Sequence, residues 1–439
     1  MAKEQLLGAS NKFFYYVMSG RATFNIRLLL TLDNLNVEIL EASFNEAIKR
    51  YPELAAQTVI KGNGLSSVKI EKPIVVVPES DKVFHFGTND TNGYLFYISY
   101  GNDHFTLSYY HGLSDVVGIV EYLRCAMYLY AIQTGFEFTE EEKAELVASF
   151  RQNESEFEKG DMKDLLDPYN ANKDAAAIPE YEYDNHPAFN IPATTYPDDV
   201  FYYHECVITL KTSEVIALTK KLGISVVPFI CDVASGAVRK EYGAGEEPVT
   251  AMLPVNYRQL CGSKTVVNCS DGILIPYYEE DEKLDITARC TKGKEYMKKQ
   301  MTEANCRKAM AGKAKSVDDF EKNEMPFLER AELMTRVAPK DAKRPLSYAM
   351  TYPGKMTLLS GLDRMLKDYE IKGWARANAV IGHSFKDTMR LQVLCRTDDN
   401  RLADCICRGF KDHGLEVQFV DNKRIYPDLM VVEELEKYE

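Results

Sequence analysis

SYYHGLSDVVG, which spans residues 108–118, is the most informative segment of this 439-residue chain. It ends an apolar run that predicts a strand over residues 105–110, and it opens a pattern that predicts a helix over residues 115–133. A histidine at the end of a strand is well placed to act as a base, because an imidazole with a pKa of about 6.5 accepts a proton at neutral pH and can return it. Asp115, four positions after His111, could orient the ring through an ion pair. Taken alone, the pattern is better explained by a half-buried histidine bonded to a nearby carbonyl.

Composition narrows the class of protein. The hydrophobic fraction of 45% and the charged fraction of 27% are typical of a globular chain, and the length suggests two or three domains with a large core. The formal net charge of -13 argues against a nucleic-acid partner, which needs a basic surface. No apolar run approaches the roughly 20 residues that span a bilayer, and residues 1–20 lack a secretory signal, so we expect a cytoplasmic protein without a membrane span. The 10 cysteines include no CxxC pair, which predicts free thiols and no metal site.

Both halves of the chain mix predicted helices with predicted strands. In the first half, Asn36 is an expected N-cap for a helix that ends before Pro52, and Thr139 opens a capping box. Residues 165–199 are dense in Pro, Asp, Asn and Ala with little periodicity, which predicts a crossover between the halves. Further strands are expected at 24–32, 94–100, 201–210, 249–254, 272–277, 347–351, 379–384, 389–395 and 416–420, and helices at 36–50, 213–222, 226–242, 284–310, 317–335 and 400–413. This order predicts an α/β (α+β) fold with antiparallel or mixed sheets, and no GxGxxG or P-loop sequence supports a nucleotide site.

Read together, several segments of the chain resemble the CoA-dependent acyltransferase superfamily. This superfamily includes chloramphenicol acetyltransferase, alcohol acetyltransferases and peptide-synthetase condensation domains, and its active-site motif is HHxxxDG. Residues 110–116 (YHGLSDV) stand in place of that motif, so that His111 takes the position of the catalytic histidine. Residues 35–54 resemble the first helix of the superfamily and the R-x-P-x-L phrase after it, and residues 253–258 (LPVNYR) resemble the PVNxR segment of the alcohol acetyltransferase branch. Residues 347–354 loosely match a strand end that is written S-N-x-G.

The resemblance implies an architecture of two chloramphenicol acetyltransferase-like subdomains with mixed sheets, which form a V-shaped pseudo-dimer around a central tunnel. We place the subdomains at residues 1–180 and 201–439, with a crossover linker at residues 181–200. In relatives, the arginine of the PVNxR segment pairs with the aspartate of the histidine motif. By the same resemblance, Arg258 is assigned to pair with Asp115.

The implied reaction moves an acyl group, acetyl or longer, from acyl-CoA to a small alcohol or amine, with no permanently bound cofactor. His111 would remove a proton from the acceptor as that atom attacks the thioester carbonyl, and the catalytic set is His111, Asp115 and Arg258. Residues expected to contact the substrates are Tyr110, Val116, Asn256, Asn268, Ser347 and Thr351. Among these, Asn268, Ser347 and Thr351 are the candidate hydrogen-bond donors to the tetrahedral oxyanion.

Two departures from the superfamily motif keep other functions open. Tyr110 replaces the first histidine, and Val116 replaces the glycine, although a β-branched residue does not take a positive φ cheaply. Gly118 could supply the lost flexibility, and no DFGWG-type segment is found near the C-terminus. One alternative is a condensation-type enzyme that takes its acyl group from an acyl or peptidyl carrier protein in trans. Another is a degenerate member that binds a ligand without turnover.

Overall fold

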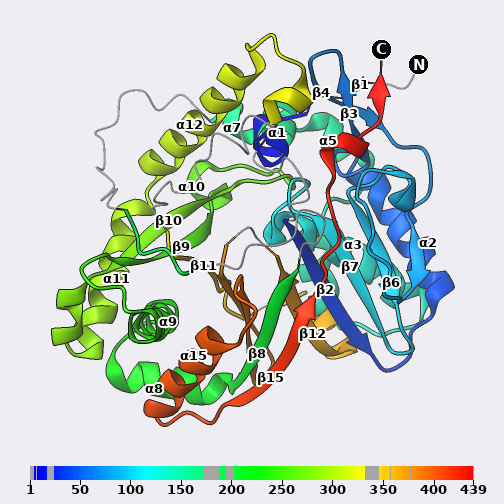
Figure 1. The fold of residues 1–439 in the computed structure, drawn as a ribbon. Helices are drawn as coiled ribbons and strands as arrows, with labels where there is room; N and C mark the ends of the chain where they lie inside the picture. Colours follow the sequence, from blue (N-terminus) through cyan, green and yellow to red (C-terminus); the bar gives the residue numbers. More distant parts are fainter. Residues whose placement is uncertain are drawn as a thin grey trace.

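Three β-sheets and the helices packed on them make up the fold in the computed structural model, which describes residues 4–5, 7–16, 24–172, 187–192, 202–331, 346–355, 357–374 and 377–438 (Figure 1). Most of the predicted crossover and the end of the helix predicted at 317–335 lie outside the described residues. All three sheets are mixed, as the sequence predicts, because each contains both parallel and antiparallel strand pairs.

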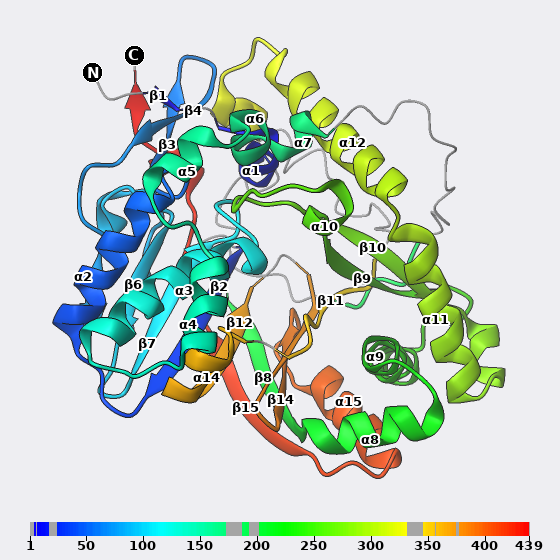
Figure 2. The ribbon, with the colours of Figure 1, turned by 180° about the vertical axis from the view of Figure 1, so that it is seen from behind.

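The first half of the chain is organised around a five-stranded sheet in the order β12-β2-β7-β6-β5. β2 runs antiparallel to β7 and β12, β7 runs antiparallel to β6, and β5 runs parallel to β6. Helices α2 and α3 lie side by side over it (Figure 2). The bounds are β2 Asn25–Leu32, β5 Val76–Pro78, β6 Phe96–Tyr100, β7 His104–Tyr110, β12 Leu366–Gly373, α2 Val37–Ala47 and α3 Val116–Gln133.

The second half is organised around a seven-stranded sheet in the order β10-β9-β11-β13-β14-β8-β15. β11 is parallel to both of its neighbours, and the other pairs are antiparallel. Helices α8, α9, α11 and α15 pack on it, and their apolar faces close the core. The bounds are β8 Tyr203–Lys211, β9 Val249–Asn256, β10 Ser270–Tyr277, β11 Tyr348–Thr351, β13 Ala379–Phe385, β14 Thr388–Cys395, β15 Gln418–Ile425, α8 Thr212–Leu222, α9 Val226–Tyr242, α11 Ile286–Gln300 and α15 Arg401–Asp412.

Strands from the second half also complete sheets of the first half. β12 pairs with β2, and β16 pairs with β3 in a small sheet of order β1-β4-β3-β16. The other edge of β12 meets the large sheet through side chains, because Ile371 N donates to His383 Nε2 at 3.4 Å and Gly373 N donates to Gln392 Oε1 at 2.9 Å. The two halves are therefore interlocked by strand exchange, and the division at 181–200 stays a prediction. The bounds are β1 Glu4–Gln5, β3 Ala56–Lys61, β4 Gly64–Lys69 and β16 Lys437–Tyr438.

The helical boundaries depart from the sequence prediction most clearly between residues 284 and 335, where the helix predicted to begin at 317 is the end of α12. The helix predicted at 284–310 is two helices, because Thr302 caps a new helix, α12, by accepting a hydrogen bond from Asn305 N. The predicted caps Asn36 and Thr139 are both confirmed. The remaining helices are α1 Ala9–Tyr16, α4 Glu140–Ala148, α5 Glu154–Lys159, α6 Met162–Leu166, α7 Pro168–Ala171, α10 Arg258–Cys261, α12 Glu303–Glu321 and α14 Ser360–Met365. Within the described ranges no single helix is long and apolar enough to cross a membrane, although α8 and α9 taken together as a bent pair meet the same length and composition criteria.

Candidate active site

The loop after β7 holds His111 between two fixed points. At its start, the His111 main-chain N–H donates to the carbonyl of Phe24, beside the first residue of β2. At its end, Asp115 caps α3, since its extended backbone (φ -88°, ψ 171°) lets Oδ1 accept from Gly118 N at 2.9 Å. Position 112 between them needs a glycine, because a Cβ there would overlap the ring of Tyr110. The strand, the glycine and the cap together fix where the imidazole lies.

The imidazole of His111 is held in one tautomer. Its Nδ1 lies 3.0 Å from the carbonyl oxygen of Ser114, and because a carbonyl can only accept, Nδ1 carries the proton. Nε2 of the neutral ring therefore keeps its lone pair and is the atom that can take up a proton. The ring of Phe14 stacks on the imidazole with a centroid distance of 4.9 Å and an angle of 28°. Burial lowers the pKa of His111 below its ordinary value, and the nearby Asp115 carboxylate opposes this only in part.

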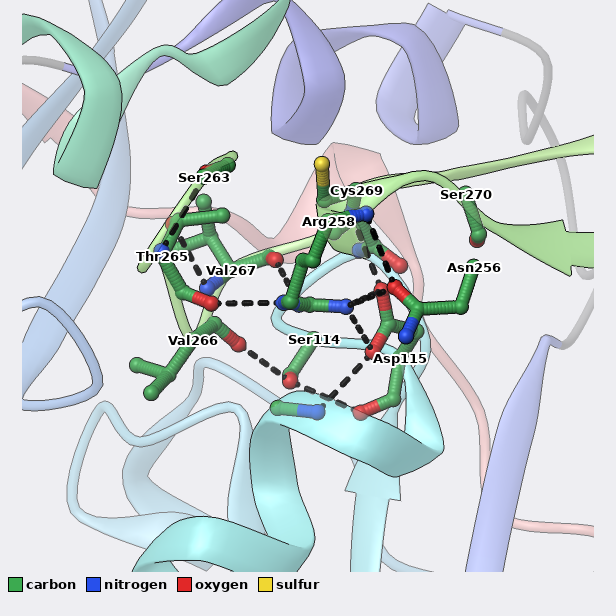
Figure 3. A network of polar contacts seen from close by, with 12 residues as sticks. Ser114, Asp115, Asn256, Arg258, Ser263, Thr265, Val266, Val267, Cys269 and Ser270 are labelled. Carbon is green, nitrogen blue, oxygen red and sulfur yellow. Dashed lines mark hydrogen bonds and ion pairs between the residues drawn. The ribbon is translucent and has the colours of Figure 1, made fainter. Parts of the chain in front are cut away.

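Asp115 and Arg258 form an ion pair between the two halves of the chain (Figure 3). Arg258 Nη1 lies 2.9 Å from Oδ1 and 2.8 Å from Oδ2 of Asp115, and the two side chains are only 10% and 9% exposed. Cys269 N also donates to Oδ2, at 2.9 Å. Burial alone would raise the pKa of Asp115, but Arg258 and the two main-chain donors outweigh it and hold that pKa below its ordinary value. The carboxylate therefore stays ionised throughout the neutral range.

The guanidinium of Arg258 is also enclosed by a main-chain loop. Nε donates to Thr265 O at 2.7 Å, and Nη2 donates to Val267 O at 2.6 Å. Nη1 reaches Asn256 Oδ1 as well, at 3.1 Å. Figure 3 shows these carbonyls and the carboxylate converging on the planar guanidinium. Arginine suits this position because its fork of N–H donors is satisfied on several sides at once, which a lysine ammonium could not achieve.

Gly118 allows the loop at 265–267 to approach the first turn of α3. A Cβ at Gly118 would overlap the carbonyl oxygen of Val266 and would lie 2.7 Å from Ser114 Oγ. Ser114 Oγ itself donates to Val266 O at 2.5 Å. The role of Gly118 is thus close approach in a helical turn, and not the flexibility suggested by the sequence.

Gly118→Ala is expected to destabilise the protein by about 1–3 kcal/mol, because the added methyl group must push the loop at 265–267 away from α3. Gly236→Ala is the matched control: Gly236 lies inside α9, and a Cβ there meets nothing within 4 Å. That change should be neutral or stabilising, because alanine favours a helix over glycine. Urea unfolding followed by circular dichroism measures both, and equal stability of the two variants would contradict the close-approach role.

Two asparagine amides support the histidine loop from outside it. Asn268 Nδ2 donates to the carbonyl of His111, and Asn11 Nδ2 donates to Gly112 O at 2.7 Å. Asn268 is fully buried, and its Oδ1 has no hydrogen-bond partner. A buried acceptor without a donor is costly, so this oxygen is an unsatisfied group beside the histidine loop.

The structure joins five of the predicted site residues through hydrogen bonds at the histidine loop. The side chains of the other four have different surroundings. The joined residues are His111, Asp115, Asn256, Arg258 and Asn268. Tyr110 is fully buried in the core against Tyr15 and Phe86.

Val116 is the first residue of α3 and is not among the residues with positive φ, so the helix needs no glycine there. Ser347 serves the main chain of β9, where its Oγ accepts from Thr250 N at 3.1 Å. Thr351 is the last residue of β11 and is half-buried.

Two residues of α1 that the sequence did not single out contact the histidine loop. Phe14 stacks on the imidazole, and Asn11 binds the loop carbonyls of Gly112 and Leu113. The aromatic cluster at residues 13–16 is the signal that could have drawn attention to α1. Its pattern alone does not say which ring meets the histidine.

Solved structures share this architecture. No protein-family model matches the chain, and neither does any curated protein sequence. TRI101 from F. sporotrichioides, complexed with coenzyme A and T-2, superposes with a TM-score of 0.59 at 10% identity over 95% of this chain and 100% of that chain. TRI3, a trichothecene 15-O-acetyltransferase from Fusarium sporotrichioides, gives a TM-score of 0.57 at 10% identity over 93% and 94%. The starter condensation domain of the rhizomide synthetase RzmA, in complex with C8-CoA, gives 0.57 at 12% identity over 94% of both chains.

These likenesses establish the fold. The chain has the two-subdomain α/β fold of the CoA-dependent acyltransferases and condensation domains, which confirms the fold that the resemblance implies. The match covers nearly the whole of the chain and of the solved structures, so both halves take part in the shared fold.

Proposed function

We propose that this protein transfers an acyl group, acetyl or longer, from acyl-CoA to the hydroxyl or amine of a small acceptor, with His111 as general base. The observation that carries the proposal is the tautomer of His111, whose Nδ1–H is bound by Ser114 O so that Nε2 is left as the basic atom. Support for a CoA donor comes from similar structures that hold coenzyme A or C8-CoA.

The proposed reaction needs little from the protein beyond a base and a fixed geometry. Nε2 takes the proton of the acceptor O–H or N–H as that atom attacks the thioester carbonyl, which gives a tetrahedral intermediate and an imidazolium. Collapse of the intermediate breaks the carbon–sulfur bond, and the imidazolium returns its proton to the departing thiolate to give free CoA and the acylated acceptor. A base positioned in this way typically contributes about 10²–10⁴-fold to the rate.

The Asp115–Arg258 pair acts in this proposal as a positioning device. Asp115 caps α3 directly after the histidine loop, and Arg258 fastens that cap to the second half of the chain. Asn268 has one amide hydrogen on the His111 carbonyl, and its second hydrogen makes it a candidate donor to the oxyanion. Ser347, directly before β11, and Thr351, at its end, stay further candidates for that role.

The pH dependence of the reaction follows from the buried imidazole. Only neutral His111 can act as base, and its pKa is lowered by burial. As pH falls, activity is therefore expected to be lost at a midpoint below about 6.5, the ordinary pKa of histidine. The profile of kcat/KM against pH measures this midpoint in the free enzyme. A midpoint above the ordinary histidine pKa would contradict the assignment.

A carrier-protein donor is the second candidate, which the likeness to a starter condensation domain favours. In that reading an acyl or peptidyl carrier protein delivers the thioester in trans. Release of free thiol from acyl-CoA, compared with release from a loaded carrier, separates the two donors. If neither donor releases thiol over a broad panel of alcohols and amines while a ligand still binds, the chain is a binding protein without turnover.

A further inference from the structure

A second cluster of polar side chains lies at one edge of the seven-stranded sheet. It consists of His204 and Cys206 on β8 and Asp421 on β15. His204 and Cys206 are two positions apart on one strand, so their side chains share a face of the sheet. Asp421 lies opposite Cys206 in the antiparallel register, which places its side chain on the same face. The cluster plays no part in the proposed acyl transfer.

The potential ligand atoms of the cluster lie close together. The nitrogen, sulfur and oxygen atoms are all within 4.8 Å of one another, and His204 Nε2 lies 2.8 Å from Asp421 Oδ1. Zinc ligands at about 2.0–2.3 Å from the ion in a tetrahedron stand roughly 3.3–3.8 Å apart, so small movements of the side chains would suffice. His204 and Cys206 are 8% and 0% exposed, and the Asp421 side chain is 28% exposed, which leaves an approach from solvent on one side.

The surrounding backbone holds the carboxylate toward the other two residues. β15 carries a bulge between Asp421 and Lys423, and Lys423 has a φ of 56°, a conformation that a non-glycine residue rarely adopts. Lys423 N donates to Asp421 Oδ1 at 2.8 Å, and Asn400 Nδ2 donates to Oδ2 at 3.2 Å. Bulges commonly redirect a side chain, and hydrogen bonds to a ligating carboxylate are typical of metal sites.

We infer that His204, Cys206 and Asp421 form a binding site for a zinc-class divalent ion. The donor set decides the class of metal, because a thiolate with an imidazole suits zinc and disfavours the hard ions Mg²⁺ and Ca²⁺. Three protein ligands leave the fourth tetrahedral position for water on the exposed side of Asp421. The ion would fasten the edge strand β15 to β8 and, through Asn400, to the start of α15. The spacing of the cysteines predicts no metal site. That spacing cannot reveal ligands that lie on two neighbouring strands far apart in the sequence.

The test uses the full chain, with any affinity tag removed, stripped with a chelator and then reloaded with zinc. We expect one zinc ion per wild-type chain by elemental analysis, and a higher unfolding temperature with zinc than with chelator. Cys206→Ser and His204→Ala should lose the ion. Cys290→Ser, a buried thiol on α11 outside the cluster, should keep it. Asn400→Ala should weaken zinc affinity by about 10–100-fold.

Cobalt(II) provides a readout that reports the thiolate directly. Wild type and Cys290→Ser should show thiolate-to-cobalt charge-transfer absorption, and Cys206→Ser should not. If Cys206→Ser does not fold, Asp421→Asn at the half-exposed position takes its place and should bind zinc more weakly than wild type. A wild-type chain that takes up no zinc, or a folded Cys206→Ser chain with the zinc content and cobalt spectrum of wild type, would overturn the inference.

Discussion

Replacement of His111 by alanine is expected to lower kcat/KM for acyl transfer by about 10²–10⁴-fold while the fold is kept. The physical reason is that Nε2 is the unprotonated atom of a ring whose Nδ1–H is already bound by Ser114 O. Free-thiol release with the best acyl-CoA and acceptor measures the rate, and circular dichroism checks the fold.

His104→Ala is the matched control for this prediction. His104 begins the same strand, β7, and its ring contacts Glu79 and Asp103 far from the loop end at His111. Its replacement should leave kcat/KM near the wild-type value. A His111→Ala protein that turns over as fast as His104→Ala would remove His111 from the reaction.

The second large effect is expected on stability. Asp115→Ala and Arg258→Ala should each cost about 3–5 kcal/mol, because each leaves a nearly buried charge without its partner. Both variants should also lose activity, since the cap of α3 sets the end of the histidine loop. Urea unfolding of the two single variants and of the double variant measures the coupling.

The free energy of unfolding of the double variant shows whether Asp115 and Arg258 stabilise the protein as a pair or independently. With both charges gone, its loss of stability should be smaller than the sum of the two single losses. Lys315→Ala is the control, because its pair with Asp319 is an exposed i,i+4 pair that water screens, and its loss should leave stability near wild type. Strictly additive single losses would show that Asp115 and Arg258 act independently.

Sequence reasoning succeeded where local chemistry specifies the backbone. The strand before His111, the helix that follows it and the caps at Asn36 and Thr139 are local signals, and the structure has each of them. The break between α11 and α12 was missed because no glycine or proline separates the two helices, and only the Thr302 cap marks it.

Strand β12 was missed for a different reason. Its sequence, LKDYEIKG, is half polar, so its apolar signal is weak. One of its edges pairs with β2, and the other is bonded by side chains of the large sheet. Such a strand is defined by partners that lie far away in the chain. The same holds for the small strands β1 and β16, which are two residues long.

The site itself was predictable only in part. The pairing of Asp115 with Arg258 joins residues 143 positions apart and came from the family resemblance, not from spacing. The carbonyls of Thr265 and Val267 that enclose the guanidinium are main-chain groups, which every residue has, so the sequence does not indicate this role. The stacking of Phe14 on His111 likewise depends on where α1 packs.

Release of CoA thiol by the purified chain, with a panel of acyl-CoAs and of alcohols and amines, is the direct test of acyl transfer with His111 as base. We expect release by the wild-type chain that depends on the acceptor and that nearly disappears in a folded His111→Ala protein. Release at the same rate by both proteins, or none by the wild-type chain from any acyl thioester, would contradict it.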